Sequence, residues 1–207
     1  QAALFQAVIQ QHYADCEDLS FRLLAAISEN LGVGGDFLFH AFEPTHQSFL
    51  RLNYYPVCPE PAAPEGLAVP RIGHLGINHH TDAGAVTLLM TDTQPGLEVF
   101  VRQRWHRIDP VSGTIIVNLG DIVQVWSNDR YHAPIHRVRT HSRKERISVP
   151  FFLNPKASFS YAPVVAGEVS LYQPIHWGEF RAKRAAGDFS DIGDEIQIAD
   201  YRVKDST

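Results

Sequence analysis

Residues 49–162 break into many short runs rich in β-branched and aromatic side chains, and this pattern limits the fold more than any other feature of the sequence. Glycine, proline, asparagine and aspartate separate the runs, which is typical of strands joined by tight turns. Short strands of this kind build sandwiches and barrels, whereas strands alternating with helices would indicate a parallel α/β sheet. The expected strands are Phe49–Tyr55, Gly73–His79, Val86–Thr91, Leu97–Val101, Trp105–Ile108, Thr114–Asn118, Ile135–Val138, Arg146–Leu153 and Ser158–Tyr161.

Helical patterns flank this β-rich core. Residues 2 to about 32 carry apolar side chains at roughly helical spacing, and Gly32 follows as a typical helix stop. Residues 34–43 predict a second short helix, and residues 175–187 predict a third. The tail that follows is polar and acidic. We expect it to pack back on the domain through Ile192, Ile196 and Ile198.

The chain of 207 residues has the length of one domain with a sizeable core. We therefore predict a single, mainly β domain over residues 1–207. In this division a helical buttress at about 1–45 packs on a core at about 48–162. A C-terminal helix and tail occupy residues 163–207.

Composition argues against several classes of protein. Apolar residues make up 44% of the chain, charged residues 20%, and the net charge is -5, which indicates neither a nucleic-acid-binding nor a membrane-surface protein. No apolar stretch approaches the roughly 18 residues that a membrane-spanning helix needs, and the N-terminus lacks the pattern of a signal peptide. Two cysteines are too few for a disulfide framework. We therefore expect a cytoplasmic protein.

Two potential metal ligands stand two residues apart in His80–Thr81–Asp82, where an expected strand ends ahead of Gly84. On a strand the two side chains would point the same way. An imidazole and a carboxylate so placed are two-thirds of the 2-His-1-carboxylate triad that holds non-haem Fe(II). Taken alone, the pattern is more often a pair of ordinary surface or core residues. His79 would point to the opposite face of the strand, and we do not expect it to be a ligand.

Two later segments strengthen the metal hypothesis. His136 lies in another strand-like run and is the candidate third ligand. Arg146 and Ser148 alternate with apolar residues in the run that ends at Leu153, so they share one face of that strand. A buried arginine is costly unless it binds something, and its planar guanidinium suits bidentate capture of a carboxylate. A barrel oriented the other way, with Arg146 on the surface, fits this run equally well.

The charges of these groups would balance around one type of ligand. Fe(II) brings two positive charges and Arg146 brings one. Asp82 brings one negative charge, and a dicarboxylic oxoacid brings two. The sum is zero, which a mostly apolar pocket tolerates.

Motifs spread over roughly residues 50–155 point to a known family by their order and spacing. They are Leu52–Pro56 with Cys58–Pro59, His80–Asp82 with Thr87–Leu89, Gly96–Val99, Trp105, Asn118–Asp121, Trp126–Asn128, His136–Val138 and Arg146–Phe152. In these motifs the chain resembles the iron- and 2-oxoglutarate-dependent dioxygenases of the isopenicillin N synthase-like superfamily. The resemblance implies a double-stranded β-helix, or jelly roll, with flanking helices and with iron near one open end.

The resemblance also implies roles for particular residues. Three of them, His80, Asp82 and His136, would bind Fe(II). A second group would bind 2-oxoglutarate, its distal carboxylate on Arg146 and Ser148. A third group would line the substrate pocket. The second group is completed by Tyr55 and Asn53, and the third group consists of Phe152, Asn154 and Tyr131.

The implied reaction is the oxidative decarboxylation of 2-oxoglutarate to succinate and CO2 with O2, coupled to oxidation of a small organic metabolite. Ascorbate is an optional further cofactor, and we expect a monomer. Because Asp82 keeps a carboxylate on the metal, hydroxylation, desaturation or ring closure is favoured over halogenation.

Two alternatives stay open. One is a non-haem iron oxidase of the same family that works without 2-oxoglutarate. The other is a non-catalytic jelly-roll binding protein or fragment. The family usually carries a further region ahead of the position of residue 1, and this sequence begins without it, which favours the second alternative.

Overall fold

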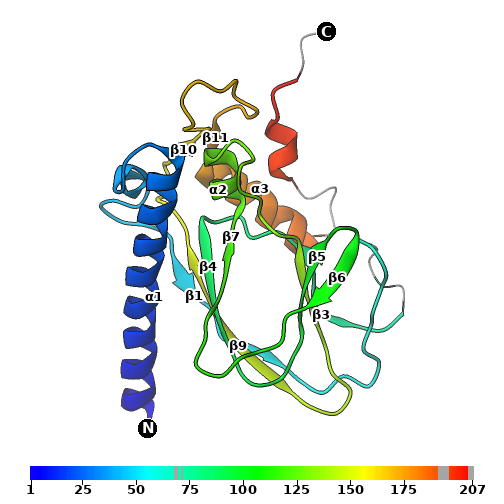
Figure 1. Ribbon diagram of the computed structural model, residues 1–207. Coiled ribbons are helices and arrows are strands. Elements are labelled where there is room, and N and C mark those ends of the chain that lie inside the picture. The colour runs from blue at the N-terminus through cyan, green and yellow to red at the C-terminus, as the bar shows by residue number, and fades with distance from the viewer. Residues whose placement is uncertain (68–69, 71, 191–195, 205–207) are drawn as a thin grey trace.

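Two antiparallel sheets face each other in the computed structural model, which describes residues 1–67, 70, 72–190 and 196–204 (Figure 1). The larger sheet has the order β1-β9-β4-β7, with β2 also paired to β9, and the smaller has the order β3-β8-β5-β6. Apart from the hairpin of β5 and β6, neighbouring strands are distant in sequence, as crossovers between two sheets require in a jelly roll. The larger sheet contains β1 (Phe49–Leu50), β2 (Asn53–Tyr55), β4 (Val86–Thr91), β7 (Ile116–Leu119) and β9 (Arg146–Leu153). The smaller contains β3 (Leu75–His80), β5 (Leu97–Val101), β6 (Arg104–Arg107) and β8 (His136–Arg139), and β10 (Ser160–Tyr161) pairs separately with β11 (Ile175–His176).

Strand β9 shows how the sequence separates a core face from a pocket face. Phe151 and Leu153 are fully buried toward the long helix α1, and Tyr13 of that helix packs edge-on against Phe151 at 5.1 Å between ring centres. Arg146 and Ser148 point into the space between the sheets. Side chains that alternate along a strand produce this division. The inward orientation of Arg146 is therefore the correct one of the two that the sequence left open.

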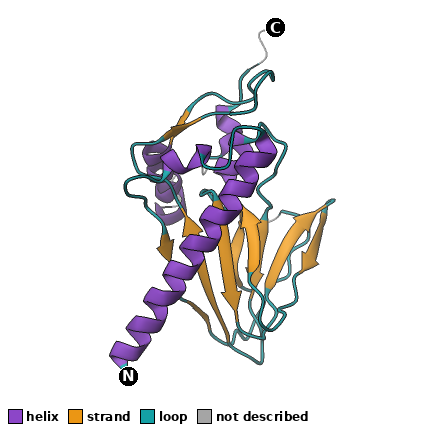
Figure 2. Ribbon diagram, turned by 60° about the vertical axis from the view of Figure 1, so that its left-hand side comes forward, coloured by secondary structure: helices purple, strands orange, loops and turns teal. Residues whose placement is uncertain are grey.

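Helix α1 (Ala2–Leu31) covers the outside of the larger sheet, in contact with β4 and β9 (Figure 2). Its buried side chains include Cys16, Leu24, Ile27 and Leu31, which form one stripe at helical spacing. The helix ends at Gly32, whose φ of 78° is the left-handed conformation that glycine adopts without strain. At the start of the helix, by contrast, the apolar side chains of Leu4, Phe5 and Val8 are exposed.

Several expected elements differ from the observed ones. The run Phe49–Tyr55 is two strands instead of one, because the chain leaves the ladder between β1 and β2. Residues 34–43 form only the 3₁₀ turn η1 (Phe37–Ala41), and the expected helix at 175–187 is α3 (Trp177–Ser190), preceded by the short strand β11. The sequence reading missed α2 (Asp121–Trp126), because six residues are too few to show helical periodicity.

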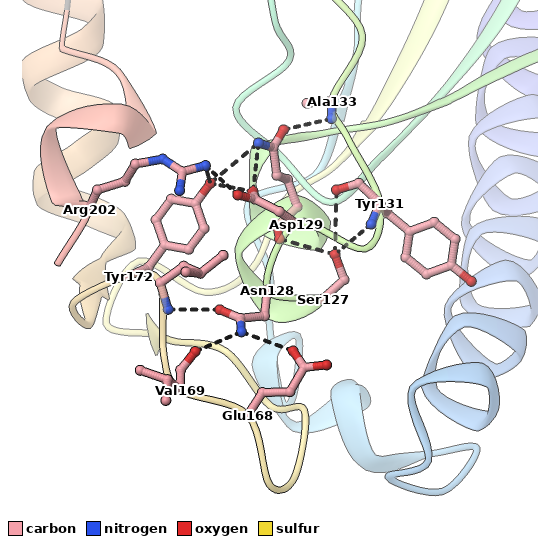
Figure 3. A network of polar contacts seen from close by, with 11 residues as sticks. Ser127, Asn128, Asp129, Tyr131, Ala133, Glu168, Val169, Tyr172 and Arg202 are labelled. Carbon is pink, nitrogen blue, oxygen red and sulfur yellow. Dashed lines mark hydrogen bonds and ion pairs between the residues drawn. The ribbon is translucent and has the colours of Figure 1, made fainter. Parts of the chain in front are cut away.

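The C-terminal segment is tied to the end of α2 by a polar network (Figure 3). Asp129 accepts hydrogen bonds from the Tyr172 hydroxyl at 2.5 Å and from Gln124 at 3.0 Å, and it also pairs with Arg202. Next to it, the Asn128 amide nitrogen donates to Glu168 and to the backbone of Val169, both at 3.0 Å. These contacts join the turn after α2 to the 3₁₀ turn η2 (Ile198–Tyr201) and its flanks.

The expected packing of the tail is confirmed where the structure describes it. Ile198 is buried, and Ile196 packs against the core. Ile192 lies outside the described residues. Among the helices of the described part of the chain, none combines the length and the apolar character that crossing a membrane demands.

Candidate metal centre and cosubstrate pocket

Three of the predicted ligands come together at one end of the barrel. The Nε2 atoms of His80 and His136 each lie 3.7 Å from Asp82 Oδ1, and all three ligand atoms lie within 4.8 Å of one another. His80 and His136 are directly paired across β3 and β8, which places their rings 4.3 Å apart. His79, which we did not expect to be a ligand, is outside this group but lines the cavity beside it.

The prediction that His80 and Asp82 share one strand is wrong. Strand β3 ends at His80 and carries register shifts just before it, so Asp82 lies in the following turn and not on a strand. The backbone carbonyl of Asp82 accepts a hydrogen bond of 2.8 Å from the N–H of Asp121, the first residue of α2. A side chain at Gly120 would meet the carbonyl oxygens of Gly84 and Asp82 at 2.2 and 2.7 Å, so this close approach requires glycine.

Hydrogen bonds orient each ligand atom toward the shared point. His80 Nδ1 lies 2.8 Å from the carbonyl of Asn78, and His136 Nδ1 lies 3.0 Å from the carbonyl of Pro134. With the ring hydrogen on Nδ1, each imidazole leaves the Nε2 lone pair for a metal. Asp82 Oδ2 accepts 2.6 Å and 2.8 Å hydrogen bonds from two side chains, which leaves Oδ1 for the metal. The two donors are Thr87 and Asn118.

The protonation states of His80 and Asp82 also favour binding of a metal cation. Burial, followed by the nearby imidazole of His136, lowers the pKa of His80 to about 4, so its ring is neutral at neutral pH. Burial alone would raise the pKa of Asp82, but the two histidines and the hydrogen bonds from Thr87 and Asn118 outweigh it and lower that pKa. The neutral imidazole of His80 and the ionised carboxylate of Asp82 are members of the donor set of non-haem Fe(II). The residues therefore fit the metal that the family implies.

A narrow pocket of about 40 Å³ runs from the triad into the barrel, toward Arg146. Arg146 is only 4% exposed, its Nη2 donates to Thr91 Oγ1 at 3.0 Å, and its Nε donates to the carbonyl of Gln94 at 3.3 Å. Its buried Nη1 has no hydrogen-bond partner, and no carboxylate of the described chain lies within 4.0 Å of the guanidinium. Leaving a buried charged donor unsatisfied is costly, so this geometry fits an anionic ligand.

The other predicted cosubstrate residues line the same pocket. Ser148 follows Arg146 on the inward face of β9, and β2 pairs with that strand so that Asn53 lies opposite Ser148 and Tyr55 opposite Arg146. The Arg146 guanidinium carbon lies 5.2 Å from the centre of the Tyr55 ring. The structure thus brings together all four residues predicted to bind 2-oxoglutarate.

A wider cavity of about 450 Å³ lies on the outer side of the triad. Phe152 and Asn154, two of the three predicted substrate residues, line it together with His80 and Asp82. The third, Tyr131, lies elsewhere. It accepts a hydrogen bond from Asn30 of α1 and borders a separate groove between that helix and β7, so its geometry gives the substrate prediction no support.

Sequence reasoning missed the residues that hold the ligand turn in place. The ligand turn is the segment after β3 that contains Thr81 and Asp82. Arg184 of α3 pairs with the buried Asp121 and donates to the carbonyl and the hydroxyl of Thr81, at 2.9 and 3.1 Å. Thr81 stands between the two ligands His80 and Asp82. Asn118 and Asp121 are the two ends of Asn118–Asp121, one of the motifs that carry the family resemblance. The family motif containing them was the available signal, but their partners are distant in sequence.

Comparisons with known proteins identify the family of this chain. The profile of the 2OG-Fe(II) oxygenase superfamily matches residues 46–155. Jasmonate-induced oxygenase 1 of Arabidopsis thaliana is 37% identical over 169 residues, which cover 79% of this chain and 40% of that protein. Flavanone 3-dioxygenase 2 of Oryza sativa subsp. japonica is 36% identical over 184 residues, which cover 86% of this chain and 51% of that protein. The chain thus spans about half the length of these relatives.

Solved structures share the fold. The structure of JOX2 in complex with 2OG, Fe and JA is 35% identical with a TM-score of 0.74, and the match covers 85% of this chain and 51% of that one. A full-length Neurospora crassa protein in complex with alpha-KG is 25% identical with a TM-score of 0.73, and the match covers 88% of this chain and 57% of that one. These neighbours confirm the predicted jelly roll. On the match to its family profile, this chain belongs to the 2OG-Fe(II) oxygenase superfamily.

Proposed function

We propose that this chain is the catalytic core of an Fe(II)- and 2-oxoglutarate-dependent oxygenase. The observation that carries the proposal is Arg146, a buried guanidinium with an unpartnered Nη1, in a pocket that ends at the triad. A ligand that spans this pocket needs an anionic group at the arginine end and metal-binding oxygens at the other. 2-Oxoglutarate has both, because one of its carboxylates is distal to the oxoacid group.

On the metal side, His80, Asp82 and His136 would hold Fe(II) on one face and leave the opposite face open. Thr87 and Asn118 would keep Asp82 in one orientation through its second oxygen. When bound, Fe(II) with 2-oxoglutarate and O2 supplies the oxidant for a C–H bond of the substrate, with release of succinate and CO2. The protein's own contribution is to position the reactants, neutralise charge and exclude water.

On the cosubstrate side, Arg146 and Ser148 would bind the distal carboxylate, with Tyr55 and Asn53 farther along the same pocket. Burial of Arg146 strengthens this interaction, because a charge-assisted hydrogen bond gains when water is excluded. The charges of metal, Asp82, cosubstrate and Arg146 cancel within the site. This balance favours 2-oxoglutarate over a ligand with a single carboxylate.

The substrate would be a small organic metabolite bound in the wider cavity, with Phe152 and Asn154 in contact with it. Its oxidation would be a hydroxylation, a desaturation or a ring closure. The solved structure of JOX2 contains a small molecule, JA, beside iron and 2OG, which supports this class of ligand. Ascorbate would be an optional additional reductant.

We also infer that residues 1–207 form one domain and that the protein is a monomer of the cytoplasm that binds neither nucleic acid nor membranes. One hydrophobic core joins α1, the larger sheet and α3, which supports one domain. Both cysteines, Cys16 and Cys58, are buried free thiols, as is usual in a reducing compartment. The negative net charge of -5 disfavours nucleic acid as a partner.

Anaerobic addition of Fe(II) and then 2-oxoglutarate tests the proposal. The parent protein should develop a weak visible metal-to-ligand charge-transfer band, and His136→Ala should abolish it. His132→Ala is the matched control, because His132 is exposed nearby and outside the triad. Failure of the parent to form the band would refute the proposal. A band that is followed, in air and with substrates, by no succinate would favour the 2-oxoglutarate-independent oxidase.

A further inference from the structure

The wider cavity beside the triad carries more positive charge than the proposed chemistry uses. Three arginines line it, Arg51, Arg181 and Arg184, whereas Asp82 is its one acidic residue among the described lining. Asp82 already serves the metal site. The cavity therefore has an excess of cationic groups beyond those needed to hold Fe(II) and 2-oxoglutarate.

One of the three arginines is occupied by the protein itself. Arg184 is 3% exposed and pairs with Asp121 and Thr81, so it positions the ligand turn. The other two differ. Neither Arg51 nor Arg181 makes a side-chain hydrogen bond or ion pair within the described residues. Two guanidinium groups are thus available to a molecule in the cavity.

The two available arginines come from different elements. Arg51 lies in the link between β1 and β2, and Arg181 lies on α3. The guanidinium carbon of Arg51 lies 5.5 Å from the centre of the Phe152 ring, a cation–π contact that holds its charged end at the cavity wall. Phe152 in turn stacks on Phe49 with ring centres 4.9 Å apart. An apolar surface therefore adjoins the cationic groups.

We infer that the substrate is an apolar carboxylic acid whose carboxylate binds Arg51 and Arg181 and whose hydrocarbon part packs on Phe49 and Phe152 beside the metal triad. This inference rests on the proposed function and names its substrate class. Charge supports it, because the metal, Asp82, 2-oxoglutarate and Arg146 already sum to zero and leave these two arginines unbalanced. A planar carboxylate matches the guanidinium fork, and the aromatic pair offers no polar partner to a more hydrophilic acid.

Calorimetric titration of the anaerobic Fe(II)–2-oxoglutarate complex tests the inference without turnover. The probes are octanoate, cyclohexylacetate and cinnamate, each beside its primary amide, which has a similar shape and no charge. Hexyl phosphate is the third type of probe. In this complex 2-oxoglutarate fills the Arg146 pocket, so an acid that binds must use another site.

We expect at least one acid to bind about tenfold or more tightly than its amide, the size of effect typical of a charged hydrogen bond. Arg51→Gln and Arg181→Gln should each remove most of this preference and leave amide binding unchanged. Arg143→Gln is the matched control, because it removes one exposed positive charge from the turn before β9, outside the cavity lining. The visible band should persist in all three variants, which shows that the metal and 2-oxoglutarate sites are intact.

Equal binding of acids and amides, absence of binding by every acid, or unchanged acid binding in both cavity variants would overturn the inference. Tighter binding of hexyl phosphate than of any acid would overturn it in favour of a phosphate ester. Failure of the parent to form the band is a different result, because it refutes the proposed function. In that event the same acid and amide titrations are carried out on the metal-free protein. The same results then support or overturn the binding of an apolar acid in the cavity.

Discussion

The two cavities that meet at the triad are built from different parts of the chain. The inner pocket is lined mostly by strands of both sheets, and its buried cation, Arg146, is only 4% exposed, whereas the exposed Arg51 borders both cavities. The wider outer cavity takes its cations from a strand link, where Arg51 is exposed, and from helix α3. A site on strands is fixed by pairing and alternation, whereas a site on links and a helix can vary without disturbing the barrel. This difference supports the proposed division, in which the inner pocket binds the cosubstrate and the outer cavity binds the substrate.

The largest expected effect is a loss of 2-oxoglutarate affinity, and it distinguishes the inner pocket from the outer cavity. Arg146→Ala should weaken 2-oxoglutarate binding by about 1.5–3 kcal/mol, the contribution of a charged hydrogen bond, because the buried distal carboxylate loses its partner. Arg181→Ala is the matched control, because Arg181 lines the outer cavity and not the inner pocket, and it should leave this affinity unchanged. Titration of 2-oxoglutarate followed by the anaerobic visible band measures both variants. Equal losses in the two variants would show that the pockets are not distinct.

The same contrast explains what the sequence could predict. Alternation along β9 placed Arg146 and Ser148 on one face, and a strand-like run placed His136, so the inner pocket followed from local patterns plus the family resemblance. Asp82 was predicted for the wrong reason, since it lies in a turn. Arg184 gave no local signal, because its role depends on how α3 packs on the turn of Thr81.

Thr87 and Thr91 of β4 orient Asp82 and Arg146, and their variants should give the next largest effects. They test whether the metal and the cosubstrate depend on different residues of the inner pocket. Thr87→Val removes a donor to Asp82 Oδ2 and should weaken metal binding about tenfold, as loss of an orienting partner typically does. Thr91→Val on the same strand removes the acceptor of Arg146 Nη2 and should weaken 2-oxoglutarate binding with little effect on the metal. Competition with a metal indicator measures the first, and titration of the visible band measures the second. If Thr87→Val weakened 2-oxoglutarate binding and Thr91→Val weakened metal binding, the roles assigned to the two threonines would have to be exchanged.

A smaller effect should appear at the polar network that anchors the C-terminal segment behind α3. Asp129→Asn weakens the contacts with Tyr172 and Arg202, and it should lower the free energy of unfolding at neutral pH by about 1–2 kcal/mol. Burial alone would raise the pKa of Asp129, but hydrogen bonds from Tyr172, Gln124 and Arg202 outweigh it and lower that pKa. Denaturant unfolding measures the difference, and 2-oxoglutarate affinity should not change.

The pH dependence follows from that lowered pKa. The folded protein holds Asp129 ionised more strongly than the unfolded chain does, so its stabilisation is fully present above the unfolded pKa of about 3.9. As the pH falls through the folded pKa, this contribution is lost, and the gap between the parent and Asp129→Asn should narrow. A gap that stays constant to the lowest pH at which the parent folds would mean that ionisation of Asp129 does not stabilise the protein.

The smallest effect is expected at Tyr131. This variant tests whether the substrate site extends from the outer cavity to the groove along α1. Tyr131→Phe removes the hydroxyl that accepts from Asn30 at a part-exposed site, and it should lower the free energy of unfolding by no more than about 1 kcal/mol. Phe152→Ala, within the cavity, should instead weaken binding of the apolar acids while the visible band persists. The two variants are compared by denaturant unfolding and by calorimetric titration of the same acids. If Tyr131→Phe weakened acid binding as much as Phe152→Ala, the substrate would have to reach the groove along α1, and the outer cavity would be larger than the one that Phe152 lines.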